Sequence, residues 1–76
     1  MPTFQIRVIN THYDNSNKLD LPSAEEARAE ALKSALQIGV EEVCNGTPFF
    51  GAEVRVESEG KVHDRLVVAI GVTRLR

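Results

Sequence analysis

The segment from Ser23 to Leu32 constrains the fold most, because it specifies both a helix and the residue at which that helix begins. Its sequence is Ser-Ala-Glu-Glu-Ala-Arg-Ala-Glu-Ala-Leu, in which alanine, the strongest helix former, recurs. The Ser23 hydroxyl can accept a hydrogen bond from the backbone amide of Glu26, whose carboxylate can reach back in a capping box. Pro22 keeps the preceding chain from being helical. We therefore expect a helix to start directly after Ser23.

The apolar side of this predicted helix is built mainly of small side chains. At about 100° per residue, one side gathers Ala24, Ala27, Ala31, Leu32, Ala35 and Leu36. The opposite side is polar and gathers Glu26, Glu30, Lys33, Gln37 and Glu41. Because alanine lets a helix approach its neighbour closely, we expect it to lie flat against a sheet. The helix ends either at Gly39 or, if that glycine is tolerated, at Asn45-Gly46.

Strand-like alternation of apolar and polar residues precedes the helix. Residues 3–10 carry apolar side chains at every second position from Phe4 to Val8, which is typical of a strand with one buried face. A polar segment rich in turn-forming residues follows, from Asn10 to Asn17. Leu19 and Leu21 then indicate a short edge strand that folds back on the first.

The pattern of residues 51–72 indicates a hairpin whose turn lies at Ser58-Glu59-Gly60. The returning strand has apolar side chains on both faces between Leu66 and Ile70, which is typical of an enclosed strand. We therefore expect it to lie centrally, between the first strand and the strand that contains Val54. The fold class is α+β, with one helix packed on a three- to four-stranded antiparallel sheet in the order β-(β)-α-β-β, in two layers.

The length of 76 residues predicts a single domain, 1–76, with a small core. Chains of this size often gain stability by self-association, and the single cysteine, Cys44, excludes an internal disulfide. The net charge of −2, with both signs mixed along the chain, argues against nucleic-acid binding. No signal sequence and no long apolar run is evident, so a soluble, cytoplasmic protein without membrane contact is expected.

The sheet face opposite the helix is the most promising binding surface. Ile9, Val67 and Ala69 form an apolar island on it, and charged pairs such as Glu53 or Glu57 with Arg65 lie beside this island. The face is either an ordinary solvated surface or an interface for a second copy, a protein partner or a small ligand. We predict the binding residues to be Phe49, Phe50, Val67, Ala69, Ile9 and Arg65.

Phe49-Phe50 supplies aromatic area at the rim of that face. Adjacent residues of an extended chain point in opposite directions, so only one of the two rings can readily enter the core. The other ring either covers the end of the helix or stays exposed as a contact residue.

Candidate catalytic and metal-binding residues are few. His12 and His63 do not form a ligand set of known spacing, and neither a metal nor a cofactor is expected. Cys44 is expected to be a small buried residue in the last turn of the helix. The sequence therefore favours a non-enzymatic role, with no catalytic residues.

An enzymatic alternative comes from a family resemblance. The Met1-Pro2 start, a strand, a helix and then Glu53-Val54-Arg55-Val56 resemble the small tautomerases. In that family an N-terminal proline is the general base, arginines hold an acidic substrate and a phenylalanine lines the pocket. The resemblance implies these roles for Pro2, Arg55 and Phe50.

Two further resemblances bear on fold and assembly. The opening Met-Pro-x-Phe, the Leu-Pro-Ser-Ala-Glu-Glu-Ala-Arg-Ala-Glu-Ala-Leu helix start and the Ala-Glu-Val-Arg-Val-Glu-Ser-Glu-Gly hairpin resemble a family of short bacterial proteins, typically alphaproteobacterial, catalogued as a domain of unknown function. The order of strand, helix and hairpin is also similar to that of the dodecins, which are small flavin-binding oligomers. Dodecin flavins stack on a tryptophan, which this chain lacks, so the dodecin resemblance implies a homo-oligomer rather than a flavin site.

Overall fold

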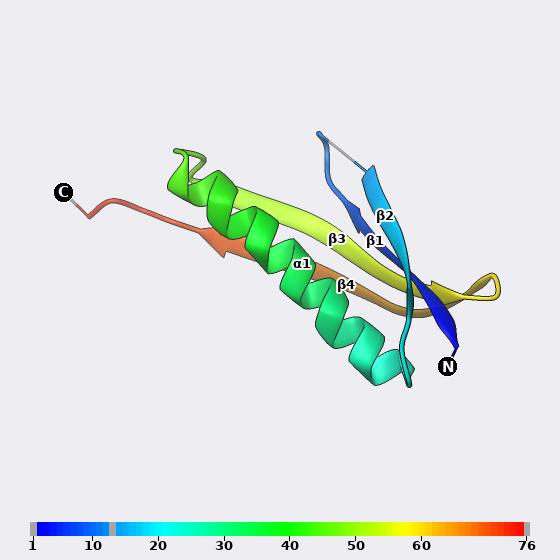
Figure 1. Ribbon diagram of the computed structural model, residues 1–76. Coiled ribbons are helices and arrows are strands. Elements are labelled where there is room, and N and C mark those ends of the chain that lie inside the picture. The colour runs from blue at the N-terminus through cyan, green and yellow to red at the C-terminus, as the bar shows by residue number, and fades with distance from the viewer. Residues whose placement is uncertain (1, 13, 76) are drawn as a thin grey trace.

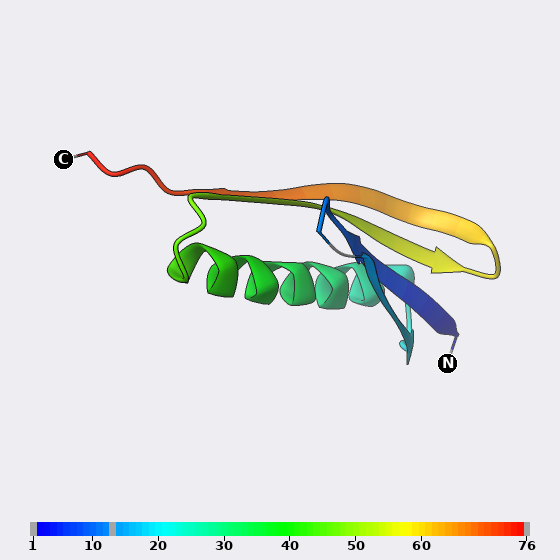
Figure 2. The same cartoon turned by 90° about the horizontal axis from the view of Figure 1, so that it is seen from above.

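A computed structural model describes residues 2–12 and 14–75, and within them the chain forms one helix and one antiparallel sheet. The elements follow in the order β1 (Thr3–Ile9), β2 (Asp14–Asp20), α1 (Ala24–Cys44), β3 (Phe49–Ser58) and β4 (Lys61–Gly71). The helix covers one face of the four-stranded sheet (Figure 1), and the view from above shows the two layers (Figure 2). The predicted α+β fold class is confirmed.

The helix begins where the capping box predicts. Ser23 is extended, with φ −155° and ψ 162°, and its Oγ accepts a hydrogen bond from the Glu26 backbone amide at 3.2 Å. The helix continues through Gly39 to Cys44, and the Asn45 N–H then donates to the Glu41 carbonyl at 3.0 Å. Gly46 follows with φ 110°, a left-handed conformation that favours glycine.

Close packing of α1 on the sheet explains why its buried residues are so small. Ala27, Ala31 and Ala35 have no exposed surface, and Gly39 continues the same stripe. A Cβ atom at Gly39 would lie 2.6 Å from Ile70 Cδ1 and 2.8 Å from Phe50 Cδ2. The predicted close seating is therefore confirmed, and the glycine inside the helix serves that contact.

The order of the strands, β2-β1-β3-β4, corrects our expectation that the last strand is central. β3 occupies the centre instead, with Val54 opposite Val8 on β1 and opposite Leu66 on β4. Val54 is completely buried, whereas Val67 on β4 is 79% exposed. The apolar residues on both faces of β4 therefore do not indicate enclosure, because one of those faces is uncovered.

β2 is longer and more polar than the predicted edge strand. It pairs with the whole of β1, from Thr3 opposite Asp20 to Ile9 opposite Asp14, although all seven of its residues are exposed. Much of the polar segment that we expected to be a loop is thus a strand. An edge strand that no helix covers needs no apolar alternation, so the sequence signal for it is weak.

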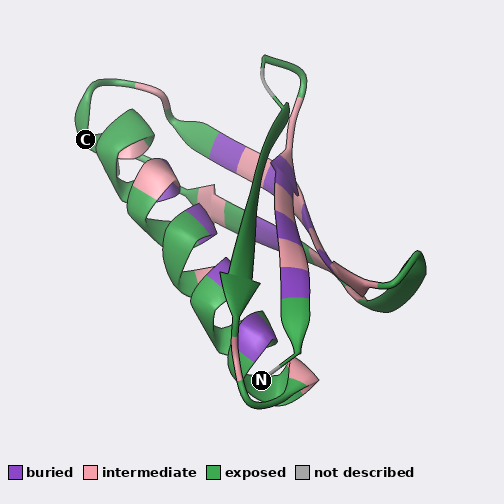
Figure 3. Ribbon diagram, turned by 45° about the vertical axis from the view of Figure 1, so that its right-hand side comes forward, coloured by how far each residue is buried: buried purple, intermediate pink, exposed green. Residues whose placement is uncertain are grey.

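The core lies between the sheet and α1, as Figure 3 shows by burial. Its residues are Phe4, Ile6, Val8, Ala27, Ala31, Ala35, Phe50, Ala52, Val54, Val56 and Val68. The hairpin turn lies at the predicted position, with Glu59 at φ 52° and Gly60 at φ 76°. In the part of the chain that the structure describes, no helix has the length and apolar character needed to cross a membrane.

Candidate binding site on the open sheet face

The face of the sheet opposite α1 is uncovered by any described element (Figure 2), and we call it the open face. Alternate residues of β1, β3 and β4 project from it. One half of this face is charged and the other half is apolar. The two halves meet at Glu53, which lies opposite Ile9 on one side and Val67 on the other.

Ion pairs organise the charged half. Glu53 Oε2 accepts hydrogen bonds from Arg55 Nε at 2.6 Å and from Arg65 Nε at 2.9 Å. The hydrogen bond from Arg65, followed by that from Arg55, lowers the pKa of Glu53 to about 2. Arg7 binds Asp14 through two nitrogens, at 3.1 and 2.6 Å, and this contact lowers the pKa of Asp14. The predicted pairing of Glu53 with Arg65 is confirmed.

These carboxylates lie beside a row of three arginines. Arg55 is directly opposite Arg7 on β1 and directly opposite Arg65 on β4. Like charges in directly opposite positions destabilise a sheet. Glu53 and Asp14 therefore make this row compatible with the fold, since each carboxylate binds guanidinium groups of the row.

The low pKa of Glu53 predicts a pH-dependent contribution to stability. Because its folded-state pKa lies below the ordinary 4.5, the ionised carboxylate stabilises the fold above pH 4.5 and this contribution is lost as the pH falls towards 2. Arg65→Gln removes the largest cause of the shift, so the pKa of Glu53 is expected to rise towards 4.5. A carbon NMR titration of the Glu53 carboxyl measures this value. Arg74→Gln, in the exposed segment after β4, is the matched control and should leave it unchanged.

The apolar half contains a shallow hollow where β1 ends. The ladder between β1 and β3 stops at Ile9 opposite Glu53, and residues 49–52 of β3 extend beyond it. A cavity of about 430 Å³ lies there. Its lining comprises Ile9, Asn10, Thr11, His12, Glu42, Thr47, Phe49, Phe50, Gly51, Ala52, Glu53, Val67 and Ala69.

The floor and rim of this hollow have different side chains. Gly51 lies opposite Ala69, so the floor is built of small residues. Phe49 and Val67 rise beside it, 62% and 79% exposed. The Phe49 ring leans over the floor, since a Cβ atom at Gly51 would lie 3.1 Å from Phe49 Cε2. A small floor between large exposed apolar side chains can accept an apolar group.

The structure brings the predicted binding residues together around one hollow and buries one of them. Ile9, Phe49, Val67 and Ala69 line the same hollow, and Arg65 reaches its edge through Glu53. Phe50 also borders the hollow, but it is 3% exposed and its ring packs in the core at Gly39. Its prediction as an open-face contact is corrected: of the adjacent pair, Phe50 enters the core and Phe49 stays outside.

Sequence reasoning missed the walls of the hollow. Glu42 and Thr47 come from the end of α1 and the loop after it, and residues 10–12 come from the loop after β1. No pattern within any single segment relates them. The loop after β1 and the loop after α1 meet at the hollow only because β3 extends beyond the end of β1.

The three residues implied by the tautomerase resemblance are not assembled within one chain. Pro2 lies at the start of β1, where its carbonyl accepts a hydrogen bond from the Leu21 backbone amide at 3.1 Å. Arg55 is opposite Arg7, five residues along β1 and thus about 16 Å away. Phe50 is buried on the other face of the sheet and beyond the far end of β1.

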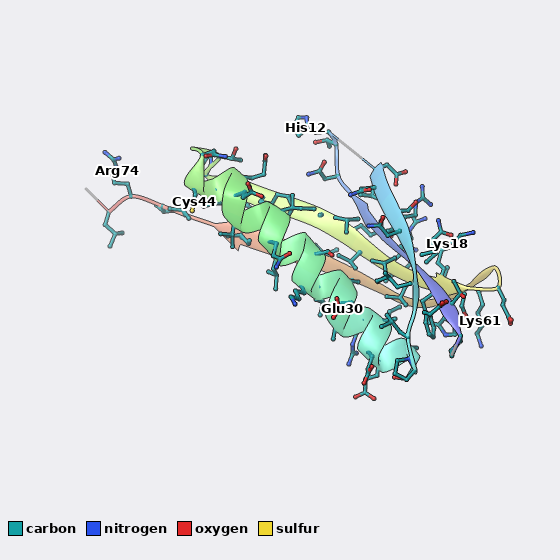
Figure 4. The ribbon with its side chains drawn as sticks, in the orientation of Figure 1. His12, Lys18, Glu30, Cys44, Lys61 and Arg74 are labelled. Carbon is teal, nitrogen blue, oxygen red and sulfur yellow. The ribbon has the colours of Figure 1, made fainter. Side chains whose placement is uncertain are left out.

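The remaining candidates are also dispersed. Cys44 lies in the last turn of α1 as predicted, but it is exposed rather than buried, and Figure 4 shows it well apart from His12 in the loop after β1. His63 Nε2 lies 2.7 Å from Ser58 Oγ. Within residues 2–12 and 14–75, no three histidine, cysteine, aspartate or glutamate side chains come together to hold a metal ion.

No protein-family model, curated protein or solved structure matches this chain. The resemblances drawn from the sequence therefore stay predictions.

Proposed function

We propose that this protein is a non-catalytic binding protein whose open face takes up a small, mainly apolar ligand or an apolar side chain of a protein partner. The observation that carries this proposal is the hollow beside Phe49. Two large apolar side chains, Phe49 and Val67, stand exposed around a floor of Gly51 and Ala69. Exposed apolar patches with a polar border are typical of binding surfaces.

The polar wall supports a ligand with hydrogen-bonding groups at one end. Thr11, His12, Thr47 and Glu42 surround the apolar floor. Small-molecule sites commonly combine an apolar lining with a few polar groups that fix the orientation of the ligand. A molecule with an apolar body and a hydroxyl or amine end fits this arrangement. As separate proposals from the sequence, we also infer that the protein is bacterial and cytoplasmic and that it forms a homo-oligomer.

Binding of an apolar dye tests the hollow. We expect anilinonaphthalene sulfonate to bind, to become fluorescent and to shift the NMR amide signals of Gly51 and Ala69. Phe49→Ala and Val67→Ser should each weaken dye binding at least fivefold, because they remove the exposed apolar rim. The matched control is Val62→Ser, a half-exposed valine of β4 that does not line the hollow.

Two results would contradict the proposal. One is a dye that leaves the signals of Gly51 and Ala69 unmoved. The other is an equal loss of binding in Val62→Ser and in the two rim variants, since a general loss would not locate the dye at the hollow.

A further inference from the structure

The two edges of the sheet differ in how they are protected from pairing with another chain. β2 is one edge, and apart from Leu19 it consists of charged and amide or hydroxyl residues. β4 is the other edge, and its second half, Leu66 to Gly71, is entirely apolar. Exposed edge strands invite pairing, and natural sheets guard them with charges, prolines or bulges. By this criterion β2 is a guarded edge.

The protection of β4 stops halfway along the strand. Its first half carries Lys61, His63, Asp64 and Arg65, and a register shift lies there, opposite Val56 and Glu57. The ladder is regular from Val54 opposite Leu66 to Phe49 opposite Gly71. The second half of β4 therefore pairs with β3 in a regular register and carries only apolar residues. This is expected of an edge strand that pairs with another chain in the assembled protein.

An apolar stripe of α1 borders the same edge. Leu36 and Val40 are 44% and 55% exposed and lie together with Leu32 along one side of the helix. Ile38 lies on the opposite flank of α1, in a cavity shared with β1 and β2. Gly39, between the flanks, faces Ile70 on β4 and Phe50 on β3. Leu36 and Val40 therefore lie on the flank of the helix that is nearer to the β4 edge of the sheet.

The chain exposes more surface than a compact monomer of its mass. A monomer of 8.4 kDa exposes roughly 4,600 Å², whereas this chain exposes 5383 Å². The excess of about 800 Å² matches what one partner buries in a standard-size interface. Three of the exposed large apolar side chains, Leu36, Val40 and Val72, lie beside the β4 edge, on α1 or directly after β4.

We propose that β4 pairs antiparallel with β4 of a second copy of this chain through the segment from Leu66 to Gly71. A two-fold axis through this segment makes the two sheets one continuous sheet, with both helices on the same face. Leu36 and Val40 of the two helices then meet above the joined strands. The joint and the hollow share Val67 and Ala69, whereas Phe49 lines only the hollow and Leu36 and Val40 lie only at the joint. Variants of these last three residues therefore let either proposal fail without the other.

The antiparallel arrangement is also complementary in charge. Two helices related by the same axis run in opposite directions, so Lys33 of one copy lies level with Glu41 of the other when the axis passes close to Gln37. Gln37 and Glu41 also border the cavity beside β1 and β2, so this charge complementarity lies on the solvent side of the stripe. Helices seated above β3 in each copy stand about three strand spacings apart, roughly 14 Å. A helix with its side chains is about 10–12 Å across, so leucine and valine are long enough to close this gap.

Sedimentation equilibrium of the full chain tests the interface. We expect a dimer at micromolar concentration, and at least a tenfold increase in its dissociation constant for Leu36→Glu and for Val40→Glu. The matched control Ser34→Glu introduces the same charge on the Ile38 flank of α1 and should leave the dimer unchanged. Phe49→Ala should also leave it unchanged, because Phe49 belongs to the open face. A strict monomer, or a dimer weakened by Phe49→Ala and not by the stripe variants, would overturn the proposal.

Cysteine cross-linking tests the strand pairing without disturbing the helix. In a Cys44→Ser background, single cysteines are placed at each of the six positions from Leu66 to Gly71, so that one of them lies at the axis. Paired strands bring at least one of them within about 5.5 Å of its counterpart, a distance that permits a disulfide. Oxidation should then give a covalent dimer from at least one of the six, and none from Asn17→Cys on β2. Equal cross-linking of Asn17→Cys, or none at β4, would contradict the proposed joint.

Discussion

Phe50→Ala is expected to lower the free energy of unfolding by about 3–5 kcal/mol, the usual loss when a buried phenylalanine is truncated. Phe50 is 3% exposed and its ring lies against Gly39, where the helix and the sheet approach most closely. Small domains are stable by only about 5–15 kcal/mol, so this change removes much of the margin. Urea unfolding followed by circular dichroism measures the difference.

Phe49→Ala is the matched control for that prediction. It removes the same atoms from the neighbouring residue, whose side chain is 62% exposed. Since little of its surface is buried, we expect the free energy of unfolding to change by less than about 1 kcal/mol. Equal losses from the two substitutions would show that the inward orientation of Phe50 is wrong.

Ala31→Leu is expected to have the next largest effect on stability, through overpacking rather than through a cavity. Ala31 has no exposed surface and faces the sheet from the middle of the alanine stripe. Additional carbon atoms there push α1 away from the strands, which costs about 1–3 kcal/mol and more where the backbone cannot adjust. The close contact at Gly39 leaves little room for such an adjustment.

The matched control is Ala29→Leu on an exposed position of the same helix. Alanine and leucine have similar helix propensity, so a comparison of the two substitutions isolates the effect of burial. We expect its free energy of unfolding to lie within about 0.5 kcal/mol of that of the original protein. A tolerated Ala31→Leu would mean that the helix is not seated as closely as its alanines indicate.

The two proposed surfaces use one scaffold in different ways. The open face offers side chains, in a hollow that forms because β3 extends beyond β1. The β4 edge offers backbone groups, supported by an apolar stripe of α1. A small domain with a thin core gains stability from burial at the edge, while its open face remains available for a ligand.

Local interactions allowed the sequence to determine much of the fold. The capping box at Ser23 places the start of α1, and the turn at Glu59-Gly60 joins β3 to β4, because both depend on residues adjacent in the chain. The alanine spacing correctly predicts close packing on a sheet. The alternation in β1 and β3 correctly identifies their buried faces.

Tertiary structure alone decided which strand is central, which phenylalanine enters the core and where the hollow lies. Apolar residues on both faces of β4 are equally compatible with a central strand and with an edge strand whose second face is uncovered. Phe49 and Phe50 are chemically identical, and the structure decides between them because β3 begins at Phe49, which puts Phe50 on the same buried face as Ala52. The physical reason is common to all three: side-chain periodicity reports which residues share a face, whereas burial depends on what the rest of the chain places over that face.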